Sequence, residues 1–287
     1  MERHVKESAR VRWGMLIEAD RCTGCFSCQL ACRDEHAGNE HRPVAAAQPA
    51  EGAAWIAIRQ TEQGSFPKVK LVRVPVPCLQ CADAPCVDAT LGAVYRRDDG
   101  IVLIDPDKAR GRRDIASSCP YGAIVWNEEA ELAQKCTFCA HLLDEGWKEP
   151  RCVEACPTQA LVFGNLDDPK SVLSERRAAR ELERLPSALD TAPAVVYAGL
   201  PTPFIAGEIA FSDRLGEPAA GVAIKLQSGS RTLESTTDNF GDFEFEQLQA
   251  DADYVLTIAH PGYERMERSL RVGIDCNIGT ITLEAAR

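Results

Sequence analysis

The sequence of 287 residues predicts a chain in two parts, an α+β domain followed by an all-β sandwich. Twelve of the 13 cysteines lie between Cys22 and Cys156, where short apolar segments alternate with short polar ones. From residue 204 onward the pattern changes, because apolar residues recur at every second position in segments separated by turns. A chain of this length is also more often two domains than one.

Composition and charge narrow the possible partners. The 43 acidic and 32 basic residues give a formal net charge of −11, which argues against nucleic acid because phosphates require a basic surface. No apolar run approaches the roughly 18 residues that cross a bilayer. Residues 1–14 contain neither an apolar signal core nor an adjacent arginine pair. We therefore expect a cytoplasmic protein, with export alongside a signal-bearing partner as the alternative.

The cysteines form tight groups, and the first of these, residues 22–32, is a complete CxxCxxCxxxC run. Tight groups in a long chain argue against a disulfide scaffold. A zinc site could use Cys136 and Cys139, but it leaves the four-cysteine run and the two Cys-Pro steps without a role. In a bacterial [4Fe-4S] run, three cysteines hold one cluster and the fourth reaches a second cluster. The spacing therefore predicts iron–sulfur clusters.

Pairs of runs that exchange their last cysteine divide the twelve cysteines into three sets of four. The first set is Cys22, Cys25, Cys28 and Cys156. The second set is Cys32, Cys136, Cys139 and Cys152. The third set is Cys78, Cys81, Cys86 and Cys119. Three [4Fe-4S] clusters are the resulting prediction.

A fourth site is missing from this arrangement. Its ligands would occupy positions that hold no cysteine, namely Ala109, Arg112, Ile115 and either Thr90 or Ala89. All these absences belong to one site, so we interpret them as the loss of a whole cluster. Arg112 is expected to fill part of the vacated volume with a cation.

The first part of the chain is expected to span residues 1–185. Short strands are expected at 14–18 and 100–104, and short helices begin inside the cysteine runs. The segments CPYGA and CPTQA, which start at Cys119 and Cys156, share a proline and a small residue at the same offsets, as a duplication would leave. The pattern is typical of a duplicated bacterial-ferredoxin-like domain, whose folding depends on metal.

The remaining candidate residues receive structural interpretations. No ligand spacing connects His4, His36, His41, His141 and His260, so surface or loop positions are expected for them. Cys276 is expected to be a small buried apolar residue. Turn chemistry, not calcium binding, is expected for Asp238, Asp242 and Asp251. No acid–base or nucleophile group emerges, so we assign no catalytic residue to this chain.

The rest of the chain predicts a helix, a linker and a sandwich. Residues 171–185 have high helix propensity, and their arginines favour a solvated face over a partner contact. Residues 186–203 contain four prolines and are expected to form a linker or tail. Residues 204–287 are expected to form an antiparallel β-sandwich, with strands near 205–211, 222–226, 243–245, 254–258 and 278–282.

Four ordered blocks carry a resemblance to a known family. They are WGMLIEADRCTGCFSC at 13–28, PCLQCADAPC at 77–86, DGIVLIDPDK at 99–108 and RCVEACP at 151–157. The chain resembles the iron–sulfur subunit of molybdenum oxidoreductases of the dimethyl sulfoxide reductase superfamily. The resemblance implies a large molybdenum-containing partner subunit, in a heterodimer or a multiple of it. It also implies that the lost cluster is the one nearest a membrane anchor, so no anchor is expected.

Three clusters with an extra C-terminal domain resemble the small subunits of pyrogallol–phloroglucinol transhydroxylase and resorcinol-type hydroxylases. This implies a partner that carries molybdenum on two pyranopterin guanine dinucleotides and acts on polyhydroxylated benzenes in anaerobic metabolism. The C-terminal part is similar to carboxypeptidase-regulatory or transthyretin-like domains, which imply a fold and little function.

We therefore expect an electron-transfer subunit whose substrate chemistry takes place in another chain. One alternative is an electron-transfer subunit of another reductase or dehydrogenase of the superfamily. The other is an assembly subunit in which the clusters are structural and do not change oxidation state.

Overall fold

The computed structural model describes residues 11–287 except 53, 215, 274 and 275. The chain divides into two compact units. Unit 1 consists of the residues up to 60 together with 73–200, and unit 2 consists of 61–72 together with 201–287. No helix of the described residues is long and apolar enough to cross a membrane.

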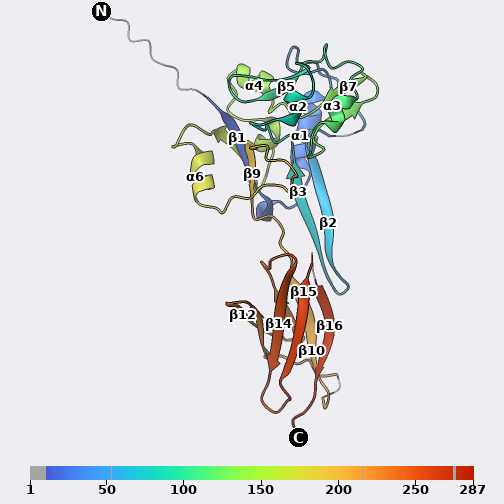
Figure 1. The fold of residues 1–287 in the computed structure, drawn as a ribbon, viewed down its shortest axis with the longest axis vertical. Helices are drawn as coiled ribbons and strands as arrows, with labels where there is room; N and C mark the ends of the chain where they lie inside the picture. The colour runs from blue at the N-terminus through green and yellow to red at the C-terminus, as the bar shows by residue number, and fades with distance from the viewer. Residues whose placement is uncertain (1–10, 53, 215, 274–275) are drawn as a thin grey trace, which may run out of the picture. The chain divides into compact units, whose positions relative to one another are not determined.

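Unit 1 contains a three-stranded sheet with β1 (Trp13–Glu18) in its centre (Figure 1). β1 pairs antiparallel with β8 (Leu161–Asn165) and parallel with β9 (Val195–Ala198). The expected strand at 14–18 is confirmed, and its residues 15–17 are completely buried. The sheet thereby joins the two ends of the cysteine-rich region, because β1 precedes the first cysteine and β8 follows the last.

Short elements connect the cysteine-bearing loops of unit 1. Two small hairpins are β4 (Val94–Arg96) with β5 (Val102–Ile104), and β6 (Val125–Asn127) with β7 (Leu132–Gln134). The short helices are η1 (Ala19–Arg21), α1 (Ser27–His36), α2 (Pro85–Asp88), α3 (Asp114–Ser117), α4 (Ala140–Asp144) and α5 (Arg151–Glu154). Helices that begin inside cysteine runs were expected, and α1 and α5 pack against each other.

The region after the cysteines differs from its predicted form. Helix α6 (Val172–Ala178) is shorter than the expected 171–185; it is capped by Ser171, whose hydroxyl accepts a hydrogen bond from the Ser174 amide. The expected linker at 186–203 contains β9, so this part of it belongs to the sheet of unit 1. The reason is that the Val195–Ala198 side chains are all buried, and the prolines lie outside the strand.

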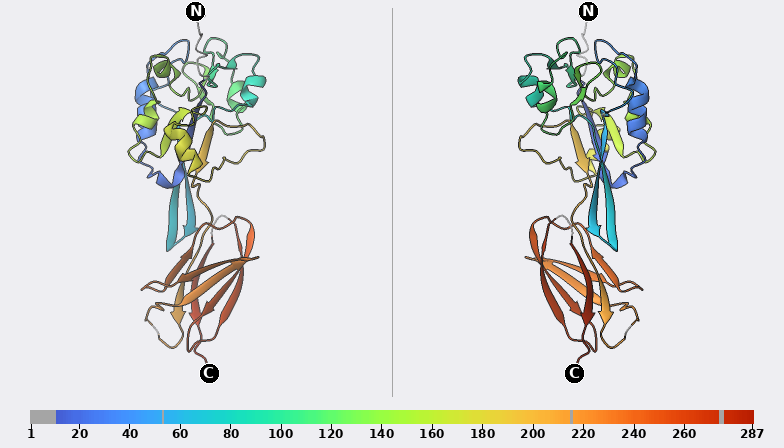
Figure 2. Two further views of the ribbon diagram at one scale, coloured as in Figure 1. Left: turned by 90° about the vertical axis from the view of Figure 1, so that its left-hand side faces the viewer. Right: turned by 90° about the vertical axis from the view of Figure 1, so that its right-hand side faces the viewer.

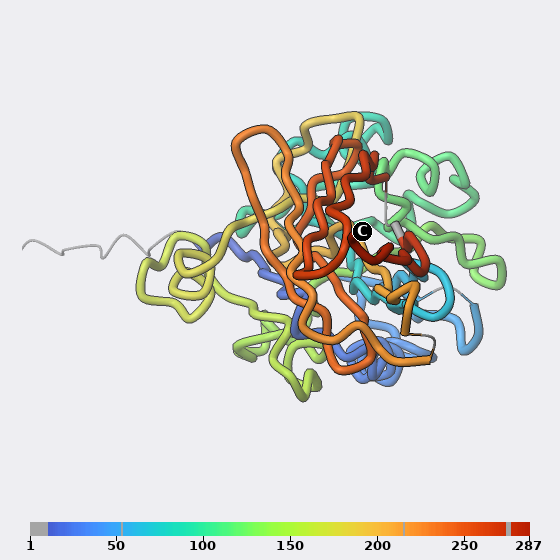
Figure 3. Tube along the Cα trace, turned by 90° about the horizontal axis from the view of Figure 1, so that it is seen from below, coloured from blue at the N-terminus to red at the C-terminus, as the bar shows by residue number. Residues whose placement is uncertain are grey.

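Unit 2 is a β-sandwich of two sheets (Figures 2 and 3). One sheet has the order β13-β10-β16 and the other has the order β12-β11-β14-β15. Alternating residues of both sheets form one apolar core, which includes Ile209, Phe243 and Leu256. The strands are β10 (Ile205–Phe211), β11 (Ala223–Ser228), β12 (Arg231–Thr236), β13 (Asp242–Phe245), β14 (Ala252–Ala259), β15 (Met266–Val272) and β16 (Cys276–Leu283).

Residues 61–72, the tip of a hairpin, also belong to unit 2. The hairpin is formed by β2 (Ala57–Ser65) and β3 (Lys68–Val76). Lys68 pairs with Asp242 at 3.0 Å, and Lys70 pairs with Glu244 and Glu246. Side chains two positions apart on a strand share a face, so the two lysines match acidic residues of the same spacing. The sequence did not predict this contribution to the sandwich.

Candidate metal centres

The twelve cysteines between residues 22 and 156 are all free thiols in unit 1. Cys25 is the exposed member of the twelve, and seven others are buried. The side chain of Cys276 lies outside the described residues, so the expectation that it is buried stays a prediction.

The backbone of the cysteine loops repeats one conformation. In the CxxC pairs that begin at Cys22, Cys78 and Cys136, the residue two positions after the first cysteine is left-handed, namely Gly24 (φ 67°), Gln80 (φ 49°) and Phe138 (φ 54°). The residue three positions after each Cys-Pro cysteine is also left-handed, in Gly122 (φ 64°) and Gln159 (φ 52°). Successive amides in such turns face a common anion, and the Phe138 amide donates to Cys136 Sγ at 3.4 Å. These loops are therefore shaped to surround thiolate sulfur.

The four thiols of the first set come together in the structure. Burial, followed by the charges of Cys156, Cys22 and Cys25, raises the pKa of Cys28 to about 12. Hydrogen bonds from the Ser27 side chain and backbone lower the pKa of Cys25. The Ala160 amide donates to Cys156 Sγ at 3.3 Å. The first set is thus assembled from the loop between η1 and α1, from the first turn of α1 and from the loop before β8.

The second set is the most deeply buried of the three. Burial, followed by the charges of Cys136 and Cys139, raises the pKa of both Cys32 and Cys152 well above the usual value. Cys32 also acts on Cys152. Residues 32 and 152 lie on the packed helices α1 and α5, which bring distant parts of the sequence to one site.

The third set lines a small cavity of about 20 Å³. All four of its cysteines face this cavity, together with Lys135. Burial raises the pKa of both Cys81 and Cys86 to about 11, with smaller contributions from Cys78 and Cys119. The cavity is therefore enclosed by four thiols in a largely apolar surrounding.

The donor chemistry of the three sets fits [4Fe-4S] clusters. Buried thiols with raised pKa values resist ionisation unless a cation neutralises them. Each set supplies four sulfur atoms, which is the ligand number of such a cluster. The sets also follow one another in space, because Cys28 acts electrostatically on Cys32 and Cys152, and Cys78 acts on Cys136. The second set therefore lies next to both of the others.

Two of the positions that were predicted for a fourth site lie in an apolar core. Ala109 and Ile115 are fully buried among Ile104 and Leu132. Thr90 is also buried, where its hydroxyl donates to the Cys86 carbonyl at 2.7 Å and accepts from the Val94 amide at 3.1 Å.

The expectation that Arg112 fills the vacated volume is wrong. Its guanidinium lies at the surface and binds Asp114 through two hydrogen bonds of 2.9 and 2.6 Å. Moving this guanidinium from its hydrated ion pair into an apolar core would cost desolvation free energy.

Lys135 is a functional candidate that sequence reasoning missed. Its side chain is 2% exposed, and Nζ donates to the carbonyls of Val102 and Cys136. The only sequence signal was its position directly before Cys136, and no ligand-spacing rule selects a lysine.

Three histidines that were expected at the surface or in loops instead meet beside the second set. The rings of His41 and His141 stack at 3.7 Å, and the ring of His36 lies 5.2 Å from each. His141 Nε2 donates to the Glu35 carboxylate at 2.9 Å. His36 is buried, with its Nε2 atom 3.7 Å from Cys139 Sγ.

The protonation of His36 and the spacing of the ring nitrogens describe this histidine cluster. Burial, and then the charges of His141 and His41, lowers the pKa of His36 to about 3, so this imidazole is neutral. The three rings place nitrogen atoms within 4.8 Å of one another, and the Nδ1 atoms of His36 and His141 are buried without a hydrogen-bond partner. The three histidines therefore form a compact cluster beside the second set.

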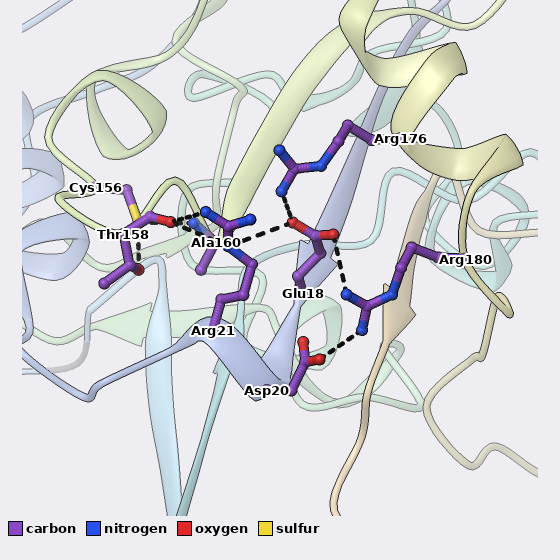
Figure 4. A network of polar contacts seen from close by, with 8 residues as sticks. All are labelled: Glu18, Asp20, Arg21, Cys156, Thr158, Ala160, Arg176 and Arg180. Carbon is purple, nitrogen blue, oxygen red and sulfur yellow. Dashed lines mark hydrogen bonds and ion pairs between the residues drawn. The ribbon is translucent and has the colours of Figure 1, made fainter.

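A polar network holds the loop of the first set (Figure 4). The carboxylate of Glu18 is 2% exposed and accepts from Arg176 and Arg180. Arg21 donates to the Thr158 carbonyl at 2.9 Å, two residues after Cys156. The arginines of α6 and its C-terminal extension thus pair within the chain; the expected solvated face is wrong for Arg176 and Arg180.

Two protein families match the two parts of the chain. Residues 69–166 match the 4Fe-4S dicluster domain. Residues 205–284 match the carboxypeptidase regulatory-like domain. The predicted order of an iron–sulfur domain followed by a β-sandwich is confirmed.

Several relatives match over most of the chain. The small subunit of pyrogallol hydroxytransferase from Pelobacter acidigallici is 37% identical over 86% of this chain and 90% of its own. The iron–sulfur subunit of arsenate respiratory reductase from Shewanella sp. is 30% identical over 65% of this chain and 96% of its own. The protein NrfC from Escherichia coli is 36% identical over 69% of this chain and 84% of its own. The chain belongs to the family of iron–sulfur electron-transfer subunits that includes the small subunit of pyrogallol hydroxytransferase.

Proposed function

We propose that this chain holds three [4Fe-4S] clusters, one on each of the three cysteine sets, and conducts electrons between them. The observation that carries the proposal is the succession of the sets, in which the second lies beside both the first and the third. Each cluster would supply one-electron chemistry, while the cysteines hold it and the left-handed loops direct amides to its sulfur atoms.

The partner in this proposal is a large subunit that carries molybdenum on two pyranopterin guanine dinucleotides. The hydroxytransferase relative is named for pyrogallol, so we propose a polyhydroxylated aromatic as the substrate of the complex. The substrate site is assigned to the partner. The cytoplasmic location expected from the sequence stays a prediction.

The first set is the proposed point of electron exchange with the partner. Cys25 is exposed, whereas the third set has two buried and two partly buried cysteines and the second set is entirely buried. Electron transfer weakens steeply with distance, so a cluster at the surface is the efficient contact. The buried second set then connects the first set to the third.

The test is the iron content and redox behaviour of the complex purified without oxygen. We expect about 12 irons per chain and three EPR signals that appear on reductive titration. Cys86→Ser should remove or alter only the third-set signal, and Cys276→Ser serves as the matched control. Three clusters of which none changes oxidation state would favour the assembly function instead. Fewer than three clusters would contradict the ligand assignment.

A further inference from the structure

Lys135 carries a buried charge without a carboxylate partner. Its side chain is 2% exposed, and its two hydrogen-bond acceptors are the carbonyls of Val102 and Cys136, which are neutral. Within the described part of the chain, no carboxylate oxygen lies within 4.0 Å of its Nζ atom. Burial of an uncompensated ammonium is costly, so a counter-charge of another kind is needed.

The available counter-charges are thiolates of two cysteine sets. Lys135 lines the third-set cavity together with all four cysteines of that set. Burial raises the pKa values of Cys81, Cys86 and Cys136, and the charge of Lys135 partly offsets this effect in each. Cys136 belongs to the second set, so one ammonium acts on two neighbouring sets.

We propose that the ammonium of Lys135 is a fixed cation shared by the clusters of the second and third sets, and that it raises the reduction potentials of both. The inference rests on the proposed assignment of clusters to these sets. One-electron reduction adds one negative charge to a cluster without making or breaking a bond. A neighbouring cation stabilises that added charge, and low exposure to water strengthens the effect.

The consequence is an effect confined to two of the three sets. Lys135 acts on cysteines of the second and third sets, whereas the cation beside the first-set loop is Arg73, which lies against Gly24 and has a buried Nε atom. We therefore expect a change at Lys135 to alter the second and third clusters and to leave the first nearly unchanged. Lys135 does not touch the reacting atoms, and it acts on the clusters through the position of its charge.

The test uses Lys135→Met in the complete complex, with EPR-monitored potentiometry. At a fixed ambient potential, the ratio of reduced to oxidised cluster should fall about tenfold for the second and third sets, which corresponds to 59 mV for a one-electron couple. The first-set ratio should change less than about threefold. Lys135→Arg should restore most of the shift, and Lys148→Met, which removes an exposed charge, should leave all three ratios unchanged.

The outcomes separate this inference from the proposed function. Three clusters with unshifted potentials in Lys135→Met would overturn the inference and leave the assignment intact. Fewer than three clusters in the unmodified complex would overturn both. If Lys135→Met takes up too little iron, Lys135→Gln keeps a donor for the Val102 carbonyl. Loss of the second and third clusters in both variants, but not in Lys135→Arg, would show a structural role and overturn the inference.

Discussion

Gln80 and Phe138 adopt a left-handed backbone although neither is glycine. Such conformations are strained and persist where the surroundings demand them. Both residues lie inside CxxC pairs, where the turn directs amides toward sulfur. At the equivalent position, Gly24, a side chain is excluded for a further reason, because a Cβ atom there would lie 1.7 Å from the Arg73 side chain. These two strained positions thus lie where the proposed clusters are held.

Gln80 also connects two cysteine loops through its buried side chain. Its Nε2 donates to the Cys136 carbonyl at 3.0 Å, and its Oε1 accepts from the Val102 amide at 2.8 Å. Gln80→Leu would leave the buried Val102 amide unsatisfied, while the Cys136 carbonyl would keep its hydrogen bond from Lys135, so we expect a loss of about 1–3 kcal/mol in stability. Thermal unfolding followed by cluster absorbance would measure it. The exposed Gln227→Leu is the control, and an equal melting temperature in both variants would contradict the prediction.

The lost site gives a second prediction about individual residues. The variant Thr90→Cys, Ala109→Cys, Arg112→Cys, Ile115→Cys places two of its four thiols, at positions 109 and 115, in a packed apolar core. Because that core has already filled the volume, we expect the iron content to stay at about 12 per chain. Iron analysis and Mössbauer spectroscopy would decide it, and about 16 irons in folded protein would show that the site can be rebuilt.

Helix α6 is anchored to β1 by charge as well as by packing. Leu173 packs against Leu16 of the sheet, and Arg176 and Arg180 reach Glu18. Glu18→Gln would leave Arg176 without a countercharge, while Arg180 would keep its ion pair with Asp20. The two arginine side chains are about 30% exposed. We therefore expect the free energy of unfolding to fall by about 2–3 kcal/mol, which is at or below the low end for a broken buried ion pair. Asp20→Asn, at an exposed position, should cost less than about 1 kcal/mol in the same thermal unfolding experiment.

The hairpin tip is joined by a pH-sensitive ion pair to Glu246, the residue that follows β13 in unit 2. The hydrogen bond and charge of Lys70 lower the pKa of Glu246. A lowered carboxyl pKa stabilises the fold above the ordinary carboxyl pKa, and the contribution disappears as the pH falls through the lowered value. Both groups are exposed, so the effect is less than about 1 kcal/mol.

Glu246→Gln should therefore increase hydrogen exchange in β13 at pH 7 and have little effect near pH 3. Glu217→Gln, which changes an exposed carboxylate elsewhere in unit 2, should have no effect at either pH. A Glu246→Gln effect that persists unchanged at pH 3 would rule out the ion pair as its source.

The two units should respond differently to loss of iron. Unit 1 contains all twelve described cysteines and many short elements, whereas unit 2 has its own continuous apolar core. Chelation of iron in the full chain should therefore increase amide hydrogen exchange in α1, α4 and α5, while β11 and β14 remain protected. Hydrogen exchange with mass spectrometry would test this, and equal loss of protection in both units would contradict it.

Much of this organisation is readable from the amino-acid sequence. Cysteine spacing identifies iron–sulfur binding because the ligands of one loop must lie within a few residues of one another. Period-two alternation identifies the sandwich because it reflects burial of one face of each strand. Strand β1 was likewise recognisable from its run of apolar residues between polar ones.

Other features arise from contacts between segments far apart in the chain. His36 meets Cys139 across 103 positions, and Lys70 meets Glu246 across 176. No local sequence pattern predicts these long-range contacts, because they depend on how whole helices and strands pack against one another. The spacing of the cysteines thus predicts which sulfur atoms hold metal. Only the tertiary structure decided which charge, that of Lys135, lies between two of the sets, because burial and proximity belong to the folded chain.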